Sequence, residues 1–110
     1  TDGAMEDLKV LAKDTRNVYG AEAKYKVAQI YFDGGQTDKA EQEVLNYIEV
    51  STPHTYWLAR SFVLLADVYM KSGRNLDAKQ YLLSLKQNYQ ADDDIAGMIE
   101  SRLEKLKTEN

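Results

Sequence analysis

Few residues in this chain have side chains suited to catalysis or metal binding, and His54 is the only histidine. Because the chain has no cysteine, His54 lacks the further ligands of a metal site and the partner of a cysteine–histidine pair. None of the serines stands in the sequence context of a nucleophile elbow. We therefore expect His54 to be an exposed loop residue and the chain not to be an enzyme.

Three consecutive carboxylates, Asp92, Asp93 and Asp94, form the tightest acidic cluster. Three carboxylates are suited to a hard cation, but this run lacks the alternating ligand spacing and the glycine of a calcium loop. It stands directly before the apolar residue Ile95, where a helix is expected to begin. Carboxylates at that place stabilise the free amides and the positive end of a helix dipole. The cluster predicts helix capping, and we expect neither a metal site nor a cofactor.

The composition bounds the class of protein. The 110 residues, of which 44% are hydrophobic and 29% charged, with one proline, predict a single folded domain spanning 1–110. The net charge of −4 disfavours nucleic acid and anionic membranes as partners. The longest apolar runs are far shorter than the roughly 20 residues that cross a bilayer, so we expect no transmembrane segment. The chain begins at Thr1 without an initiator methionine, which suggests a fragment of a longer protein.

The elements that must position these residues follow from an internal repeat, because the sequence matches itself at an offset of 38 residues. The identical pairs are Ala21 and Ala59, Ala28 and Ala66, Tyr31 and Tyr69, Gly35 and Gly73, Ala40 and Ala78, Gln42 and Gln80, and Leu45 and Leu83. Each copy therefore predicts the same unit of structure.

Each unit reads as two helices joined by a glycine turn. Apolar residues at about 3.6-residue spacing predict helices over 21–33 and 37–50 in the first copy, and over 53–72 and 75–85 in the second. Thr37, Thr52 and Asn75 are expected to cap three of these helices, with Pro53 at a first helical position. No Lys-Ser or Lys-Thr pair follows the glycines, so they predict turns rather than a phosphate-binding loop.

The two units resemble the tetratricopeptide repeat family. The resemblance is carried by Val27, Ala28, Tyr31, Gly35 and Ala40 in the first copy and by Leu65, Ala66, Tyr69, Gly73 and Ala78 in the second. It implies an all-α fold, a right-handed superhelix of antiparallel helix pairs in which the small residues let helix axes approach closely. Two departures are the period, which exceeds the family's value of about 34, and Lys24, which stands where a bulky apolar residue is common.

The flanking segments also read as parts of repeats. Residues 1–17 are expected to form the second helix of an upstream repeat, 18–52 the first repeat, 53–90 the second, and 91–110 a C-terminal capping helix. In this last segment Glu104 and Lys107 stand at the positions of Ala66 and Tyr69. Polar residues suit a terminal helix whose outer face no further repeat covers.

The resemblance implies a scaffold or adaptor that binds a peptide or a partner helix in a concave groove formed by the first helices. Helical geometry places six residues on the groove: Tyr25, Gln29, Phe32, Val63, Asp67 and Met70. The alternative, that these side chains pack against the next helix of the chain itself, stays open. A clamp for a terminal carboxylate is not supported, because Tyr25 and Gln29 occupy its first two positions.

A second functional hypothesis is architectural. In it the chain is the end segment of a longer array that assembles or self-associates through its terminal helix faces. The glycine turns and tyrosine-rich first helices are also similar to tandems in bacterial cell-envelope proteins, which favours the envelope or periplasm only slightly. The localisation and the identity of the partner stay open.

Overall fold

The computed structural model describes residues 2–49 and 53–108, and within these ranges it contains helices and turns but no strand. The helices are α1 (Asp2–Leu11), α2 (Val18–Asp33), α3 (Thr37–Glu49), α4 (Thr55–Lys71), α5 (Asn75–Asn88) and α6 (Ile95–Thr108). The all-α prediction is confirmed. None of the described helices combines the length and the apolar character that crossing a membrane requires.

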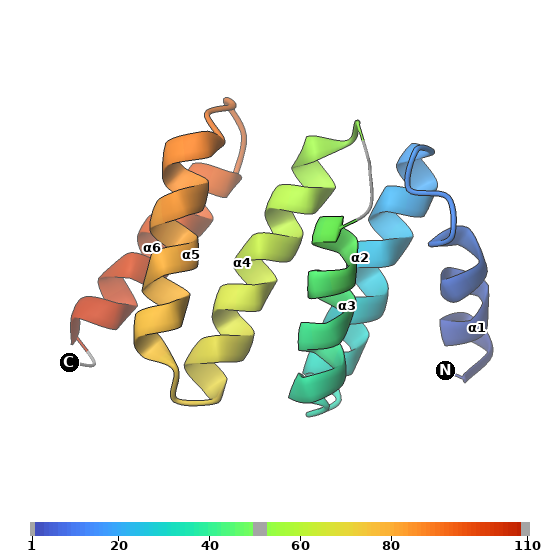
Figure 1. The fold of residues 1–110 in the computed structure, drawn as a ribbon, viewed down its shortest axis with the longest axis horizontal. Coiled ribbons are helices and arrows are strands. Elements are labelled where there is room, and N and C mark those ends of the chain that lie inside the picture. The colour runs from blue at the N-terminus through green and yellow to red at the C-terminus, as the bar shows by residue number, and fades with distance from the viewer. Residues whose placement is uncertain (1, 50–52, 109–110) are drawn as a thin grey trace.

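The helices stand side by side along the longest axis of the molecule, with α1 at one end and α6 at the other (Figure 1). Each helix packs against the next one in sequence, and in addition α2 packs against α4 and α4 against α6. In the described part of the chain α3 makes no such contact with α1 or α5. The helices α2, α4 and α6 therefore form the more tightly spaced of two layers, which we call the inner layer.

The turns after α2 and α4 have the same backbone geometry. Gly35 and Gly73 have φ values of 80° and 78°, in the left-handed region that glycine adopts without steric cost. In each turn the next amide donates back to the last helical turn, from Gln36 to the Tyr31 oxygen at 2.8 Å and from Arg74 to the Tyr69 oxygen at 2.7 Å. The glycine turns expected from the sequence are present at both places.

Small residues lie where the helices of each pair meet. Ala28, Ala40, Ala66 and Ala78 are each at most 1% exposed and form part of a core with buried Leu65 and Leu82. A larger side chain at these positions would have to displace a neighbouring helix, because protein interiors are close-packed.

The departure at Lys24 has a structural partner. Its ammonium lies 3.2 Å from Glu43 Oε2 and donates to Asn46 Oδ1 at 2.6 Å. The positions 38 residues later hold Phe62 and Tyr81, whose ring centroids are 6.2 Å apart. An ion pair in the first helix pair thus occupies the place of an aromatic pair in the second. Both positions differ between the two copies, and each copy has a contact between its two helices there.

Two predicted helix starts were wrong, by two and by three residues. α4 begins at Thr55 rather than at Pro53, because Pro53 belongs to a turn in which its carbonyl accepts from the Thr55 amide at 3.2 Å. The cap expected at Thr52 lies outside the described residues. α5 begins at Asn75 as predicted, but its N-cap is Arg74, and α3 likewise begins at Thr37, so neither Asn75 nor Thr37 has the capping position expected from the sequence. α2 starts at Val18 rather than at residue 21, because the side chain of Asn17 accepts the Tyr19 amide at 2.8 Å.

Gly20, near the start of α2, allows the preceding loop to approach closely. A Cβ atom there would lie 1.8 Å from the carbonyl oxygen of Asp14 and 2.7 Å from that of Leu11. Only a residue without a side chain fits such an approach of backbone to backbone. The close approach therefore holds α1 and its loop against α2.

Candidate functional site

A cavity of about 530 Å³ opens between the three helices of the inner layer. Its walls are Phe32 from α2, Asp67, Met70 and Lys71 from α4, and Ser101, Arg102 and Lys105 from α6. Three of the six residues predicted for the groove, Phe32, Asp67 and Met70, are among them. We call this surface, together with the side chains around Arg60 described below, the inner-face site.

Asp67 is held by a bidentate ion pair. Arg102 Nε donates to Asp67 Oδ1 at 2.7 Å and Nη2 donates to Oδ2 at 2.9 Å. A third donor, Nη1, reaches the Met98 carbonyl oxygen at 3.1 Å. Because both carboxylate oxygens already accept from Arg102, Asp67 joins α6 to α4 and its negative charge is compensated within the site.

The apolar part of the cavity is formed by Phe32 and Met70, which are both half-buried. Lys71 is exposed beside them, and its ammonium lies 5.9 Å from the centroid of the Phe32 ring. No carboxylate of the described residues lies within ion-pair distance of Lys71. The lining thus combines an apolar floor with three cationic side chains and one carboxylate.

Further along the inner layer, Tyr25 and Gln29 begin a chain of hydrogen bonds. The Tyr25 hydroxyl donates to Gln29 Oε1 at 2.7 Å, and Gln29 Nε2 donates to Asp33 Oδ1 at 2.8 Å. Tyr25 is only 8% exposed and belongs to the core. Val63 is 3% exposed and belongs to the core. For Tyr25 and Val63 the structure therefore has the packing arrangement that the sequence left open as the alternative.

Arg60, which sequence reasoning missed, lies at the centre of an aromatic cluster. Its guanidinium carbon is 4.9 Å from the ring centroid of Tyr25, 5.9 Å from that of Tyr56 and 5.8 Å from that of Trp57. Nη2 donates to the Tyr25 hydroxyl at 3.2 Å and Nη1 to the Tyr56 hydroxyl at 3.0 Å. The guanidinium is therefore oriented by stacking and by two neutral acceptors.

Among the described residues, the charge of Arg60 has no direct counter-ion. No carboxylate of the described residues lies within 4.0 Å of it, and the nearest link to one runs through the Tyr56 hydroxyl, which donates to Asp94 Oδ1 at 2.8 Å. Burial lowers the pKa of Arg60, but the hydrogen bonds to Tyr56 and Tyr25 outweigh it and raise that pKa above its usual value. The signal that was available in the sequence is spacing, since Arg60 shares a helical face with Val63 and Asp67.

Two carboxylates of the acidic cluster, Asp93 and Asp94, accept hydrogen bonds within the chain. Asp93 Oδ1 accepts the Ile95 amide at 2.9 Å, which is the capping role expected from the sequence, and Asp93 Oδ2 accepts from the Tyr89 hydroxyl at 2.6 Å. Burial and the hydrogen bond to Asp93 raise the pKa of Tyr89 to about 12. In the described part of the chain, no three histidine, aspartate or glutamate side chains are placed so that they could hold a metal ion together.

His54 is half-buried rather than an exposed loop residue. Its Nε2 lies 2.8 Å from the carbonyl oxygen of Arg16, which can only accept a hydrogen bond, so Nε2 carries the proton in this contact. The ring joins the segment before α4 to the segment before α2. The sequence did not reveal this role, because the two residues are 38 positions apart.

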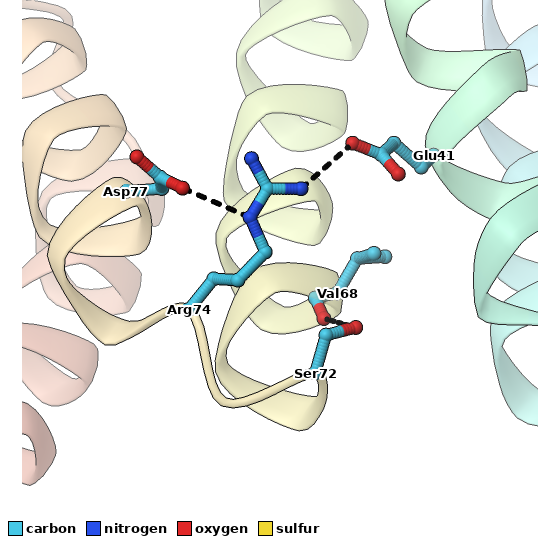
Figure 2. A network of polar contacts seen from close by, with 5 residues as sticks. All are labelled: Glu41, Val68, Ser72, Arg74 and Asp77. Atoms are coloured by element: carbon cyan, nitrogen blue, oxygen red, sulfur yellow. Dashed lines mark hydrogen bonds and ion pairs between the residues drawn. The ribbon is translucent and has the colours of Figure 1, made fainter.

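A second arginine, Arg74, lies outside the inner layer, at the turn between α4 and α5 (Figure 2). Its Nη1 lies 3.4 Å from Glu41 Oε2 and its Nε donates to Asp77 Oδ2 at 2.9 Å. The Tyr69 ring centroid is 4.3 Å from the guanidinium, and burial together with a hydrogen bond to Glu41 raises the pKa of Tyr69 above its usual range. This cluster, which we call the Arg74 joint, ties α3 to the second helix pair.

Comparison of the chain with protein-family models, with curated proteins and with solved structures found no match. Function is therefore inferred from the geometry and the charges of the inner-face site.

Proposed function

We propose that this chain is a tetratricopeptide-type module, a right-handed superhelix of helix pairs whose inner layer binds an extended segment of a partner protein. The repeat resemblance is supported by the matching turns at Gly35 and Gly73 and by the buried alanines at equivalent positions. The binding role rests on one observation, the cavity between α2, α4 and α6.

The cavity has the properties of a side-chain binding pocket. Its volume of about 530 Å³ lies in the range of specific ligand sites, and its walls come from three helices that are distant in sequence. Half-buried Phe32 and Met70 offer apolar area that a partner side chain would remove from water. Aromatic residues and methionine recur at the centres of protein interfaces for this reason. Binding of this kind, and no catalytic step, is the activity we propose.

The proposal is tested with a displayed library of unstructured peptides selected on the purified chain. Selected peptides are then titrated against the native chain, a Phe32→Ser and Met70→Ser double variant, and a matched control, Leu83→Ser, which removes an apolar side chain from the exposed face of α5. We expect binding to be lost in the double variant and retained in the control. Equal loss in both, or amide shifts on labelled protein confined to α3 and α5, would place binding elsewhere and refute the proposal.

A second candidate function, assembly through an end of the array, is favoured by the exposed apolar residues of α1. Val10 is 65% exposed and Leu11 is 50% exposed, whereas the outward residues Glu104 and Lys107 of α6 are charged. An apolar helix face is suited to cover by another helix, and a charged one is suited to solvent. Sedimentation of the native chain and of a Val10→Glu variant over a concentration series tests this candidate. Assembly predicts a concentration-dependent mass in the native chain only.

A further inference from the structure

We propose that the segment bound at the inner-face site is acidic, with two carboxylate side chains four residues apart and an apolar side chain midway between them, all on one side of an extended chain. This inference rests on the proposed function, because it specifies the chemistry of the partner that the inner layer would bind. It is carried by the charges of the site and by the spacing of its cations.

The first anchor for a carboxylate lies at the cavity. Arg102 and Asp67 compensate one another through their bidentate pair. Lys71 then adds a further positive charge to the lining, and it has no ion-pair partner among the described residues. The chain as a whole carries a net charge of −4, so the excess of positive charge is a property of this surface and not of the protein. Complementary charge of this kind selects partners and orients them.

The second anchor is Arg60. A guanidinium has five N–H donors, and the two hydroxyl contacts to Tyr25 and Tyr56 leave others for a ligand. Stacking against three aromatic rings holds the side chain in one orientation, which reduces the conformational entropy lost on binding. An oriented arginine without a direct counter-ion is suited to receive a carboxylate from outside.

The carboxylates of the inner layer itself are already engaged. Asp33 accepts from Gln29, Asp67 accepts from Arg102, and Asp94 accepts from Tyr56. The donors in these contacts are Gln29, Arg102 and Tyr56. None of them is Arg60 or Lys71, so these contacts can stay in place when Arg60 and Lys71 bind a ligand. Of these three carboxylates only Asp67 pairs with a cation, whereas Arg60 and Lys71 have no ion-pair partner among the described residues.

The spacing of the two anchors sets the length of the ligand. Arg60 and Lys71 both lie on α4, about three helical turns apart, so they share a face and are separated by about 16 Å along the axis. An extended chain advances about 3.3 Å per residue and its side chains alternate between two sides, so only an even separation places both carboxylates on one side. Four residues advance about 13 Å, and the reach of the side chains covers the remaining distance. Phe32 and Met70 lie near the Lys71 end and would receive an apolar side chain of the segment between the two carboxylates.

The experiment uses three fluorescently labelled peptides that differ at two positions only. The first has two glutamates four positions apart with a leucine midway between them, the second has glutamines and the third has lysines at the two glutamate positions. Fluorescence anisotropy is measured against the native chain at low and high salt. We expect the glutamate peptide to bind about tenfold more tightly than the glutamine peptide, the lysine peptide to bind most weakly, and the difference to shrink at high salt.

Variants of the protein connect the preference to the two anchors. Lys71→Glu and Arg60→Gln are each expected to weaken binding of the glutamate peptide by about fivefold, and Arg60→Lys to weaken it less, because the charge is kept. Lys79→Glu makes the same change of charge on the exposed face of α5 and is expected to leave binding unchanged. Thermal melts monitored by circular dichroism verify that each variant is folded.

The outcomes separate this inference from the proposed function. If the three peptides bind equally and all are lost in the Phe32→Ser and Met70→Ser double variant, the inner layer binds peptides but the acidic preference is wrong. If Lys79→Glu weakens binding as much as Lys71→Glu, or if a single-stranded oligonucleotide of equal charge binds as tightly, the effect is general electrostatic attraction and the inference is refuted. If the glutamate peptide does not bind the native chain, the inference fails, and the library selection then decides the proposed function by itself.

Discussion

Arg60 and Arg74 have similar surroundings in one respect and opposite surroundings in another. Each guanidinium lies against a tyrosine ring, Tyr25 for Arg60 and Tyr69 for Arg74. Arg74 also contacts two carboxylates from different helices, whereas the hydrogen bonds of Arg60 among the described residues go to the hydroxyl groups of Tyr25 and Tyr56. The compensated arginine joins elements of the fold, and the uncompensated one has charge and donors to offer to a ligand. The carboxylates around an arginine, rather than the arginine itself, thus separate a structural role from a binding role.

The largest loss of stability is expected from a substitution in the core of α4, the helix that carries Arg60 and precedes the turn at Arg74. Ala66 is 0% exposed and lies on α4 within the hydrophobic core. Ala66→Arg would bury a charge and overfill the site, and should cost about 3 kcal/mol or more of the free energy of unfolding. Thermal and urea unfolding should show this loss, while Ala96→Arg at an exposed position of α6 should not. If Ala66→Arg unfolds at the same temperature as the native chain, the helix packing described above is contradicted.

A smaller loss of stability is expected from replacing either arginine, and its dependence on salt should differ between Arg60 and Arg74. Arg74→Met removes two ion pairs, and Arg60→Met removes two hydrogen bonds to neutral hydroxyls. Salt screens exposed ion pairs, so the fall in Tm caused by Arg74→Met should shrink between 0.05 and 0.5 M sodium chloride. The fall caused by Arg60→Met should stay about constant. Equal salt dependence of the two variants would remove the distinction between the two sites.

The smallest effect is expected from the tyrosines at the ends of these networks. Burial and Asp93 raise the pKa of Tyr89 to about 12 from its ordinary value of 10.0, and burial, with a contribution from Asp94, raises that of Tyr56. A raised folded-state pKa means that the neutral phenols stabilise the fold fully below pH 10 and that this contribution is lost as pH rises toward 12. Tyr89→Phe should therefore reduce the dependence of urea-unfolding free energy on pH between 10 and 12. An unchanged dependence, with Tyr19→Phe at an exposed position as control, would contradict the role of Tyr89.

Much of the fold was predictable because its causes are local. Apolar residues at helical spacing specified the helices, and two glycines 38 positions apart specified matching turns. The helix starts were less predictable. The start of α4 depends on the turn at Pro53, and the start of α2 depends on the cap by Asn17. Several neighbouring residues could begin either helix, so periodicity alone does not fix the first residue.

The candidate site was predictable only in part. The helical period placed Phe32, Asp67 and Met70 on one surface, and the structure has all three at the cavity. The helical period could not show that Val63 is covered by neighbouring side chains, because burial depends on the position and rotation of the next helix. Nor could it show that Asp67 is compensated, because Arg102 lies 35 residues later.

By itself, the sequence determined the all-α class, the repeated helix pairs and the small residues between them, since backbone preference and periodicity act over a few residues. The tertiary structure alone decided which charges are paired, that Arg60 stacks among three rings, and that Gly20 must lack a side chain where the Asp14 carbonyl approaches it. Those properties depend on distances between segments that are remote in sequence, and such distances are set by the packing of whole helices.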